Sequence, residues 1–205
     1  MSESRNQQYE QLEEMSDEEL MKQFQQGAVV AYDILMDRYE EPLKHYIYKF
    51  VKEWQEAEDI LQETFMRVFR NRHSYRPVAK FSTWLYTIAG NLARSEYRKR
   101  KRRNVTSIQS VNRDNEEYEM DLPDETYSPD EDAQGAVQED HIQRALMEIP
   151  EEFREVVVLR DIQHLSYKEI AEITGLPMGT VKSRINRGRS KLQDLLEEVY
   201  EPEAA

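Results

Sequence analysis

The chain has 205 residues, of which 34% are charged and only 6 are glycine, a composition typical of helical proteins. It has no cysteine, which excludes disulfides and zinc–thiolate sites, and its four histidines (His45, His73, His141 and His164) show no metal-ligand spacing. It contains no run of eighteen apolar residues and no charged-then-apolar leader, so we expect a cytoplasmic protein without membrane insertion, cofactor or metal.

The net charge of -13 is distributed unevenly along the chain. Residues 1–103 carry 18 basic and 17 acidic side chains, whereas residues 104–140 carry 1 and 12. This second segment also contains Pro123 and Pro129 and has no sustained apolar period, so it cannot bury enough surface to offset the entropy of ordering. We therefore expect an all-α protein of two small helical domains joined by a flexible acidic linker. The expected division is an N-terminal segment with a short helix (1–26), a first domain (27–103), the linker (104–140), a second domain (141–200) and a tail (201–205).

The first two predicted helices lie between residues 16 and 50. A capping box of Ser16 and Glu19 starts the first helix, which Gly27 ends. Apolar residues between positions 34 and 50 then recur at intervals of three and four and predict a second helix. Pro42 is expected to kink or divide it.

A third helix is predicted over residues 56–72, EAEDILQETFMRVFRNR. Its apolar positions form one core stripe: Ala57, Ile60, Leu61, Thr64, Phe65, Val68 and Phe69. The outward face is polar and includes Asp59, Gln62 and Glu63. Taken alone, such a face is most often simply solvated.

Residues 75–103 begin as a short loop and continue as a helix capped near Ser82, with a polar ladder beside the apolar stripe: Asn91, Arg94, Ser95 and Arg98. Seven of the last ten residues are Lys or Arg, enough to follow a phosphate backbone. Because unpaired bases stack on aromatic rings while cations hold their backbone, this mixture favours single-stranded nucleic acid. Phe81 and Trp84 are interpreted as core residues, which leaves Tyr75, on the loop, as the stacking candidate.

Residues 166–192, SYKEIAEITGLPMGTVKSRINRGRSKL, predict two short helices joined by a glycine turn. Ser166 and Glu169 form a second capping box, Gly175 supplies the turn and Pro177 suits the start of the second helix. The expected buried positions are Ile170, Ala171, Ile173, Val181, Ile185 and Leu192. The outward residues of the second helix are types that contact bases and phosphates in a major groove, which predicts a DNA-binding helix-turn-helix: Lys182, Ser183, Asn186 and Arg187. A helical hairpin with a solvated basic face is the alternative for this segment alone.

Four segments, in this order, resemble the extracytoplasmic-function (ECF) group of bacterial RNA polymerase sigma factors, in the sigma-70 family. They are AEDILQETF at 57–65, FSTWLYTIAGN at 81–91, IPEEFREVVVLRD at 149–161 and LSYKEIAEITGLPMGTVKSRINRGRSKL from Leu165. The resemblance implies that residues 27–103 are sigma domain 2, which binds core polymerase and the minus-10 element. It also implies that residues 141–200 are sigma domain 4, whose helix-turn-helix binds the minus-35 element.

The resemblance also implies roles for individual side chains. On the clamp of the largest polymerase subunits, the implied contacts are Asp59, Gln62 and Glu63. At the minus-10 element, where the loop from residue 75 to 80 would capture a flipped base, they are Tyr75, Arg76, Lys80, Asn91, Arg94, Ser95 and Arg98. At the minus-35 element they are Lys182, Ser183, Arg184, Asn186, Arg187 and Arg189, with Arg184 and Arg189 at phosphates. Two positions depart from the family pattern: Asn186, where some relatives have an aromatic residue, and Gly90, where many have a basic one.

We therefore interpret the chain as a sigma factor that directs core RNA polymerase to specific promoters and helps to melt the minus-10 region, and not as an enzyme. The implied partners are core polymerase, promoter DNA in double-stranded and melted form, and an anti-sigma factor. An autonomous helix-turn-helix regulator that binds operators as a dimer is the first alternative, although Leu192, Leu195 and Leu196 are too brief a heptad pattern for a zipper. An RNA-binding or structural adaptor is the second.

Overall fold

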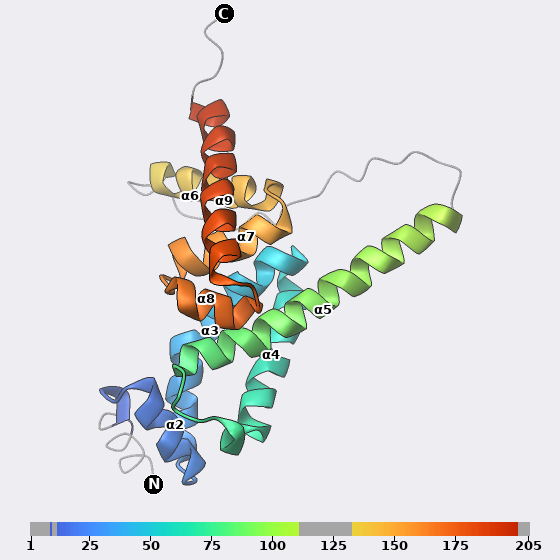
Figure 1. Cartoon of the computed structure of the whole chain (residues 1–205). Helices are drawn as coiled ribbons and strands as arrows, with labels where there is room; N and C mark the ends of the chain where they lie inside the picture. The colour runs from blue at the N-terminus through green and yellow to red at the C-terminus, as the bar shows by residue number, and fades with distance from the viewer. Residues whose placement is uncertain (1–8, 10–11, 111–132, 201–205) are drawn as a thin grey trace, which may run out of the picture.

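The computed structural model describes residue 9, residues 12–110 and residues 133–200, and in this part of the chain all regular secondary structure is helical (Figure 1). This confirms the predicted all-α fold class. The expected tail at 201–205 and the central part of the expected linker lie outside the described residues. In chain order the elements are α2 (Asp17–Gln25), α3 (Val29–Val51), α4 (Trp54–Arg70), η1 (Arg72–Ser74), α5 (Phe81–Ser110), α6 (Ala133–Glu148), α7 (Glu151–Val157), η2 (Val158–Ile162), α8 (Tyr167–Thr174) and α9 (Met178–Tyr200).

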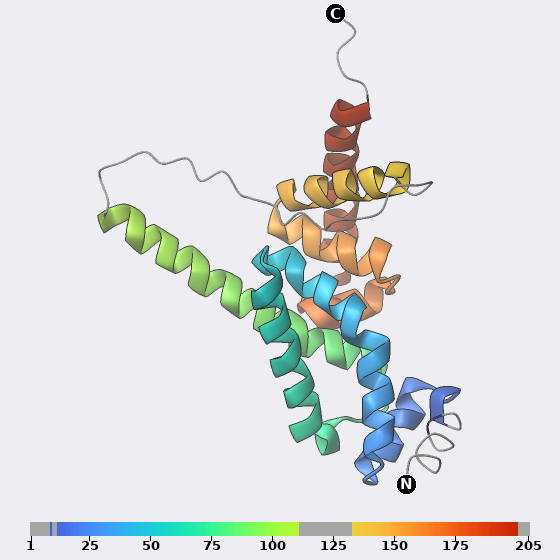
Figure 2. The same ribbon diagram turned by 180° about the vertical axis from the view of Figure 1, so that it is seen from behind.

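The first group of helices, α2 to α5, begins as the sequence predicts. Ser16 and Glu19 form the capping box of α2. Gly27, just beyond the end of this helix, has a φ of 104°, a conformation that glycine adopts without strain. Pro42 lies inside α3, so it does not divide the helix. Figure 2 shows that the α3 ribbon changes direction along its length, as expected when a proline removes one backbone hydrogen bond.

The core of this group contains nearly all of the stripe predicted on α4. Six members are buried: Ala57, Ile60, Leu61, Thr64, Phe65 and Val68. The hydroxyl of Thr64 is satisfied by donating to the Ile60 carbonyl at 2.7 Å. The seventh member, Phe69, is 38% exposed, so its predicted burial is wrong. Its ring packs at the edge of the core, with centroids 5.3 Å from those of Phe24 and Tyr32.

The second group of helices, α6 to α9, contains the predicted helix-turn-helix. Ser166 and Glu169 form the capping box of α8, and Gly175 ends this helix with a φ of 71°. Four of the predicted core residues are buried: Ile170, Ile173, Val181 and Ile185. Ala171 and Leu192 are partly buried against the same core. Local capping and turn chemistry therefore position the second helix of the motif as expected.

Gly188 allows α9 to approach α7 closely. A Cβ atom at this position would lie 2.5 Å from Cγ2 of Val157 and 3.3 Å from the carbonyl oxygen of Phe153. Any side chain here would force the two helices apart. The contact fixes α9, and with it the basic face of that helix, relative to the rest of the group.

Helices extend into both ends of the expected linker. The helix α5 continues to Ser110 and α6 starts at Ala133, so residues 104–110 and 133–140 are helical. The segment 104–110 contains neither proline nor glycine, so nothing in it stops the helix. Figures 1 and 2 both show the second half of α5 projecting away from the rest of the described chain.

The two groups of helices pack against each other. The helix α8 lies against α5, and α7 lies against α3. Buried residues of both groups belong to one continuous hydrophobic cluster. The structure therefore shows a closed arrangement, in which parts of the two predicted DNA-binding domains face one another.

Candidate nucleic-acid and polymerase interfaces

The loop from residue 75 to 80 connects η1 to α5, and its first side chain is buried. Tyr75 is only 4% exposed, and its ring centroid lies 5.3 Å from that of Trp84. Its hydroxyl donates to the Ala79 carbonyl at 2.9 Å, and burial raises the pKa of Tyr75 to about 12. The expectation that this ring stands free to stack on a base is therefore wrong, because the ring is buried within the first group of helices. The exposed side chains of the loop include Arg76 and Lys80, both predicted contacts.

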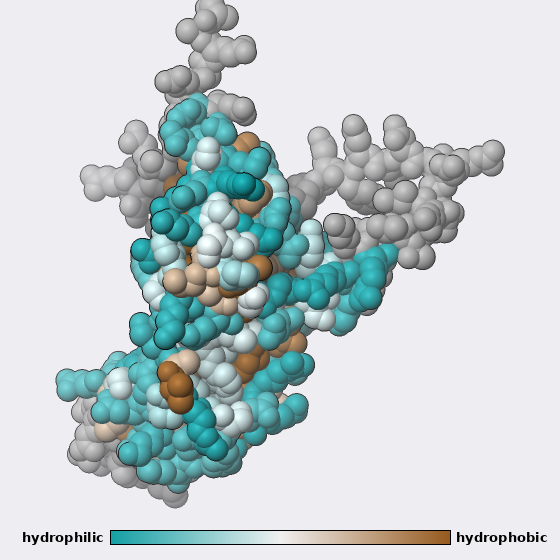
Figure 3. Space-filling model, viewed as in Figure 1, coloured by the Kyte–Doolittle hydropathy of each residue, from teal (hydrophilic) through white to brown (hydrophobic). Residues whose placement is uncertain are grey.

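The polar ladder predicted on α5 is present, but one member faces the second group of helices. Asn91, Ser95 and Arg98 are exposed. Arg94 forms an ion pair with Glu155 of α7 and donates to Oδ1 of Asn91 at 2.8 Å. Arg94 is therefore not free to contact DNA in the closed arrangement. Beyond the ladder, where Lys99, Arg100 and Arg102 are exposed, Figure 3 shows hydrophilic surface along α5.

Glu155 is the centre of a largely buried polar cluster between the two groups. Its side chain is 10% exposed, and the Tyr46 hydroxyl donates to it at 3.3 Å. Burial raises the pKa of the Glu155 carboxyl, although the charge of Arg94 acts in the opposite direction. Gly90 makes room for the cluster, because a Cβ atom there would lie 2.8 Å from the Tyr46 hydroxyl oxygen and 3.1 Å from a terminal nitrogen of Arg94. This gives a structural reason for glycine at position 90.

Other polar contacts also connect the two groups. The ammonium of Lys80 lies 2.9 Å from Oε1 of Glu169, at the start of α8. The guanidinium of Arg154, in α7, donates to the carbonyl of Lys49 at the end of α3, at 2.6 Å. Two predicted minus-10 residues, Lys80 and Arg94, are thus each paired with a carboxylate of the second group of helices.

The second helix of the motif, α9, presents a basic face. The four side chains predicted to reach into a major groove are exposed: Lys182, Ser183, Asn186 and Arg187. Arg184 forms an ion pair with Glu152 at 2.9 Å, and Nε of Arg189 donates to Asp161 at 3.0 Å. The residues expected at bases are thus open to solvent, whereas the two expected at phosphates are paired with acidic side chains of their own domain.

The predicted polymerase-binding residues lie on one polar face of α4, because positions 59, 62 and 63 share a helical face. Asp59 and Gln62 are exposed. The side chain of Glu63 is 43% exposed and forms an ion pair with Arg67, one turn later, at 2.7 Å. This face therefore presents acidic and amide groups that a partner can contact.

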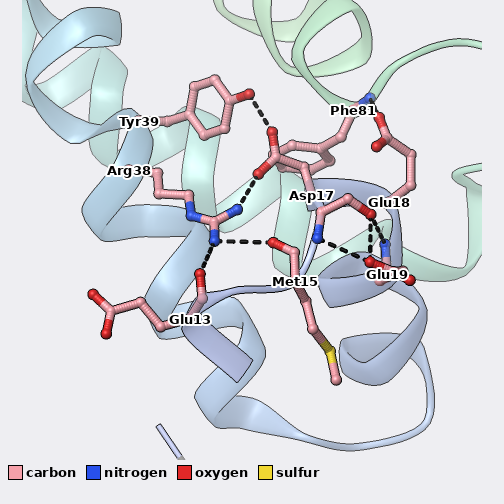
Figure 4. A network of polar contacts seen from close by, with 9 residues as sticks. Glu13, Met15, Asp17, Glu18, Glu19, Arg38, Tyr39 and Phe81 are labelled. Carbon is pink, nitrogen blue, oxygen red and sulfur yellow. Dashed lines mark hydrogen bonds and ion pairs between the residues drawn. The ribbon is translucent and has the colours of Figure 1, made fainter. Parts of the chain in front are cut away.

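The sequence patterns did not identify two residues of α2 that reach the 75–80 loop. Glu18 accepts a hydrogen bond from the backbone N–H of Phe81 at 3.0 Å (Figure 4). Gln25 donates to the carbonyl oxygens of Arg72 and Tyr75 at 2.7 and 3.1 Å. A contact between residues far apart in the chain has no local sequence signal.

These observations define a class of protein: its described part is all helical, and it carries a helix-turn-helix with an exposed basic face and a second basic helix upstream. Among the described residues, none of the helices combines the length and apolar character that a membrane crossing needs. The same residues contain no group of three or more potential metal-binding side chains.

Comparison with known proteins gives the family. Residues 35–103 match sigma-70 region 2, and residues 140–192 match sigma-70 region 4. The chain is 33% identical to the ECF RNA polymerase sigma factor SigW of Bacillus subtilis, over 91% of this chain and 100% of that protein. It is 32% identical to the RNA polymerase sigma-H factor of Pseudomonas aeruginosa, over 91% and 96%. The chain therefore belongs to the ECF group of the sigma-70 family.

Solved structures share the fold. The sigma factor RpoE of Bartonella quintana, in complex with the anti-sigma factor NepR, matches with a TM-score of 0.59 and 28% identity, over 86% of this chain and 98% of that one. The structure of CnrH in complex with the cytosolic domain of CnrY matches with a TM-score of 0.64 over 88% and 97%, and at 24% identity it supports the fold alone.

Proposed function

We propose that this chain binds core RNA polymerase, directs it to specific promoters and helps to melt the minus-10 region, while bond formation remains with the polymerase. The observation that carries the proposal is the presence of regions 2 and 4, in order, in one chain. Both regions present exposed basic side chains in the structure, on α5 and on α9. The proposal places the protein in the cytoplasm, where the polymerase acts on DNA.

For the polymerase contact, the proposed surface is the polar face of α4 formed by Asp59, Gln62 and Glu63. It lies on a helix whose opposite side is fixed in the core, so its side chains project from a rigid base. A rigid helix face is suited to docking on a preformed partner surface, because little ordering entropy is lost on binding.

For the two DNA elements, the proposed surfaces differ in kind. The helix α9 presents Lys182, Ser183, Asn186 and Arg187 from one exposed face, which suits insertion into the major groove of the minus-35 element. On α5 and its preceding loop, exposed Asn91, Ser95, Arg98 and Arg76 suit an element whose bases leave the stack. Arg94, which is paired with Glu155, joins this second surface only if the closed arrangement opens. Lys80 remains largely exposed beside Glu169, and Tyr75 is buried within the first group, against Trp84.

An anti-sigma factor is the third proposed partner. The similar structure of RpoE from Bartonella quintana is a complex with the anti-sigma factor NepR. By this likeness we infer that a protein of the same kind holds the present chain away from polymerase until a signal releases it.

The experiment that tests the proposal is reconstitution. Purified full-length chain is mixed with bacterial core polymerase and a library of randomised duplex DNA, and the templates of the resulting transcripts are sequenced. We expect transcripts from templates that share two elements at a fixed spacing, with none from core polymerase alone. Permanganate footprinting of a selected template should show unpaired thymines over the downstream element.

The same purified chain and DNA also distinguish a sigma factor from an autonomous helix-turn-helix regulator. A regulator would bind duplex DNA tightly and specifically as free protein, in a gel-shift at physiological salt. We expect only weak binding, because Arg94 is paired within the protein and residues 104–140 carry 12 acidic side chains that compete with phosphates. Tight specific binding without polymerase would contradict the sigma-factor proposal.

A further inference from the structure

Helix α2 holds the 75–80 loop at both of its ends, although α2 lies outside the residues that match sigma-70 region 2. Gln25, the last residue of α2, donates from Nε2 to the carbonyl oxygens of Arg72, at 2.7 Å, and Tyr75, at 3.1 Å. Glu18, the second residue of α2, accepts from the backbone N–H of Phe81 at 3.0 Å. One short helix therefore contacts the chain where the loop starts and where it ends.

The Glu18 contact occurs where α5 needs a cap. The first N–H groups of a helix have no partner within the helix. The residue before Phe81 is Lys80, whose ammonium can only donate hydrogen bonds. A carboxylate at this point satisfies one N–H group and interacts favourably with the positive end of the helix dipole. Glu18 thus supplies, from 63 residues away, a cap that the preceding residue cannot.

The helix α2 is itself fixed to α3, so Glu18 does not lie on a loose segment. The neighbouring Asp17 accepts a hydrogen bond from Arg38 at 2.6 Å and another from the Tyr39 hydroxyl. Figure 4 shows these contacts beside the capping box of α2 and the contact from Glu18 to Phe81. Three apolar side chains of α2 are also buried in the core: Leu20, Met21 and Phe24. The cap of α5 is therefore held in place by the first domain as a whole.

Between its two attachment points the loop presents exposed side chains at Arg76, Val78 and Lys80. A loop whose ends are fixed loses less conformational freedom when it binds a ligand than a loop whose ends move. Any base that enters this loop would therefore meet a conformation that α2 has already selected.

We propose that Glu18 and Gln25 are positioning residues, which pre-organise the 75–80 loop to capture an unpaired base of the minus-10 element. The inference rests on the proposed function of that loop. Both residues act through backbone groups of the loop ends, so neither needs to touch DNA.

The test uses full-length protein assembled with core polymerase. The probe is a selected promoter prepared as a fork, with duplex DNA upstream and a single strand over the minus-10 element. We expect Glu18→Ala to weaken binding of the fork by about fivefold, the usual order for loss of a helix cap. Gln25→Ala loses two hydrogen bonds to backbone carbonyls and should weaken binding by a similar factor. Binding of core polymerase and of fully duplex promoter should change by less than about twofold. Glu18→Gln keeps an acceptor oxygen and should restore most of the binding.

Matched controls and a second measurement separate positioning from folding. Glu14→Ala and Gln26→Ala alter exposed side chains next to the same helix and should bind the fork as the wild type does. Hydrogen exchange of the Phe81 amide, measured on the free chain, should accelerate in Glu18→Ala and stay close to the wild-type rate in Glu18→Gln. This second measurement needs neither polymerase nor DNA.

Unchanged fork binding in both alanine variants, with a wild type that binds the fork, would overturn the inference and leave the proposed function intact. Parallel loss of core binding, helicity and fork binding would also overturn it, because α2 would then only hold the fold together. A wild-type holoenzyme that does not bind the fork would contradict the proposed function itself.

Discussion

Arg187 is exposed on the face of α9 that we assign to the minus-35 element. Arginine donates two parallel hydrogen bonds to a guanine edge, and such a contact is worth about 1–3 kcal/mol of discrimination. Arg187→Ala should therefore relax the preference of the holoenzyme at one upstream base pair. The measurement is competition between promoters that carry each base pair in turn.

Arg184 provides the matched comparison for Arg187. Because we place it at a phosphate, Arg184→Ala should weaken binding uniformly across sequences and reduce the salt slope by about 1. If Arg187→Ala behaved in the same uniform way, Arg187 would be a phosphate contact and its assignment to a base would be wrong.

Gly188 offers a test of how the motif is held. An alanine Cβ at this position would lie 2.5 Å from Val157, and such overpacking costs about 1–3 kcal/mol. Gly188→Ala should lower the free energy of unfolding by that order, measured by urea denaturation of the full chain. Gly179 lies in the same helix and has no atom within 4 Å of its Cβ position. Gly179→Ala should leave stability unchanged or raise it by up to about 1 kcal/mol, because alanine is the better helix former.

At the scale of the element, the polar face of α4 gives a prediction about assembly. Changing Asp59 and Glu63 together to lysine should abolish holoenzyme formation, because two charges at the proposed contact are reversed. Exposed substitutions move stability by within about 0.5 kcal/mol, so helicity and melting temperature should hardly change. Pull-down of core polymerase is the measurement. Undiminished pull-down would remove α4 from the interface.

The control for this pair should carry the same change of charge elsewhere in the domain. Glu40 and Glu41 are exposed on α3. Their double substitution by lysine changes the net charge by the same amount and should leave assembly intact. A loss of assembly in both double variants would point to overall charge and not to the α4 face.

Elements whose signals are local could be predicted from the sequence. The capping boxes at Ser16 and Ser166 and the turn at Gly175 were all predicted, since each depends on residues within one or two turns. The cap of α5 was predicted near Ser82, whereas the helix already starts at Phe81, and its contact with Glu18 depends on tertiary structure alone. The same holds for the candidate site. Exposure of Asn91, Ser95 and Arg98 on α5 followed from helical spacing. The burial of Tyr75 and the partner of Arg94 instead depend on how separate helices meet.

At the scale of the whole molecule, a substitution at Gly90 tests how firmly the two groups of helices are joined. Gly90→Ala would displace the Tyr46 hydroxyl and the Arg94 guanidinium, which lie 2.8 and 3.1 Å from the new Cβ atom. Because both groups contact Glu155 of α7, this displacement should weaken the contacts to Glu155 and favour separation of the groups. The chain has no cysteine, so dye labels can be placed at Arg70→Cys in α4 and Asp194→Cys in α9, both exposed positions. Lower energy transfer in the Gly90→Ala chain is the expected result. Equal transfer in both chains would mean that the polar cluster absorbs the methyl group without opening.

The pH dependence of the closed arrangement follows from Glu155. Burial raises the pKa of this carboxyl, against the effect of Arg94, so the closed arrangement takes up a proton at a higher pH than the separated one. The contribution of Glu155 should therefore make closure more favourable as the pH falls through this raised pKa. The effect is complete once the pH is below the ordinary glutamate pKa of about 4.3.

The pKa of Glu169 is shifted in the opposite direction, so its effect on the pH dependence of closure must be separated from that of Glu155. Burial opposes the change, but hydrogen bonds from Ser166 and Lys80 lower the pKa of Glu169. Energy transfer is therefore measured against pH in the wild type and in a Glu155→Gln chain. The difference between the two curves gives the contribution of Glu155 to closure. A difference that falls with decreasing pH would show that Arg94 outweighs burial at this site.

Ionic strength should also affect whether Arg94 pairs with Glu155 or contacts DNA. Arg94 cannot hold Glu155 and a phosphate at the same time. Contacts with DNA weaken steeply as the salt concentration rises, because each contact with a phosphate releases counterions from the DNA. A pair whose side chains are 14% and 10% exposed is screened far less. If Arg94 contacts the minus-10 DNA as we propose, added salt should shift it from the DNA toward the carboxylate, so that low ionic strength favours promoter contact and high ionic strength favours closure.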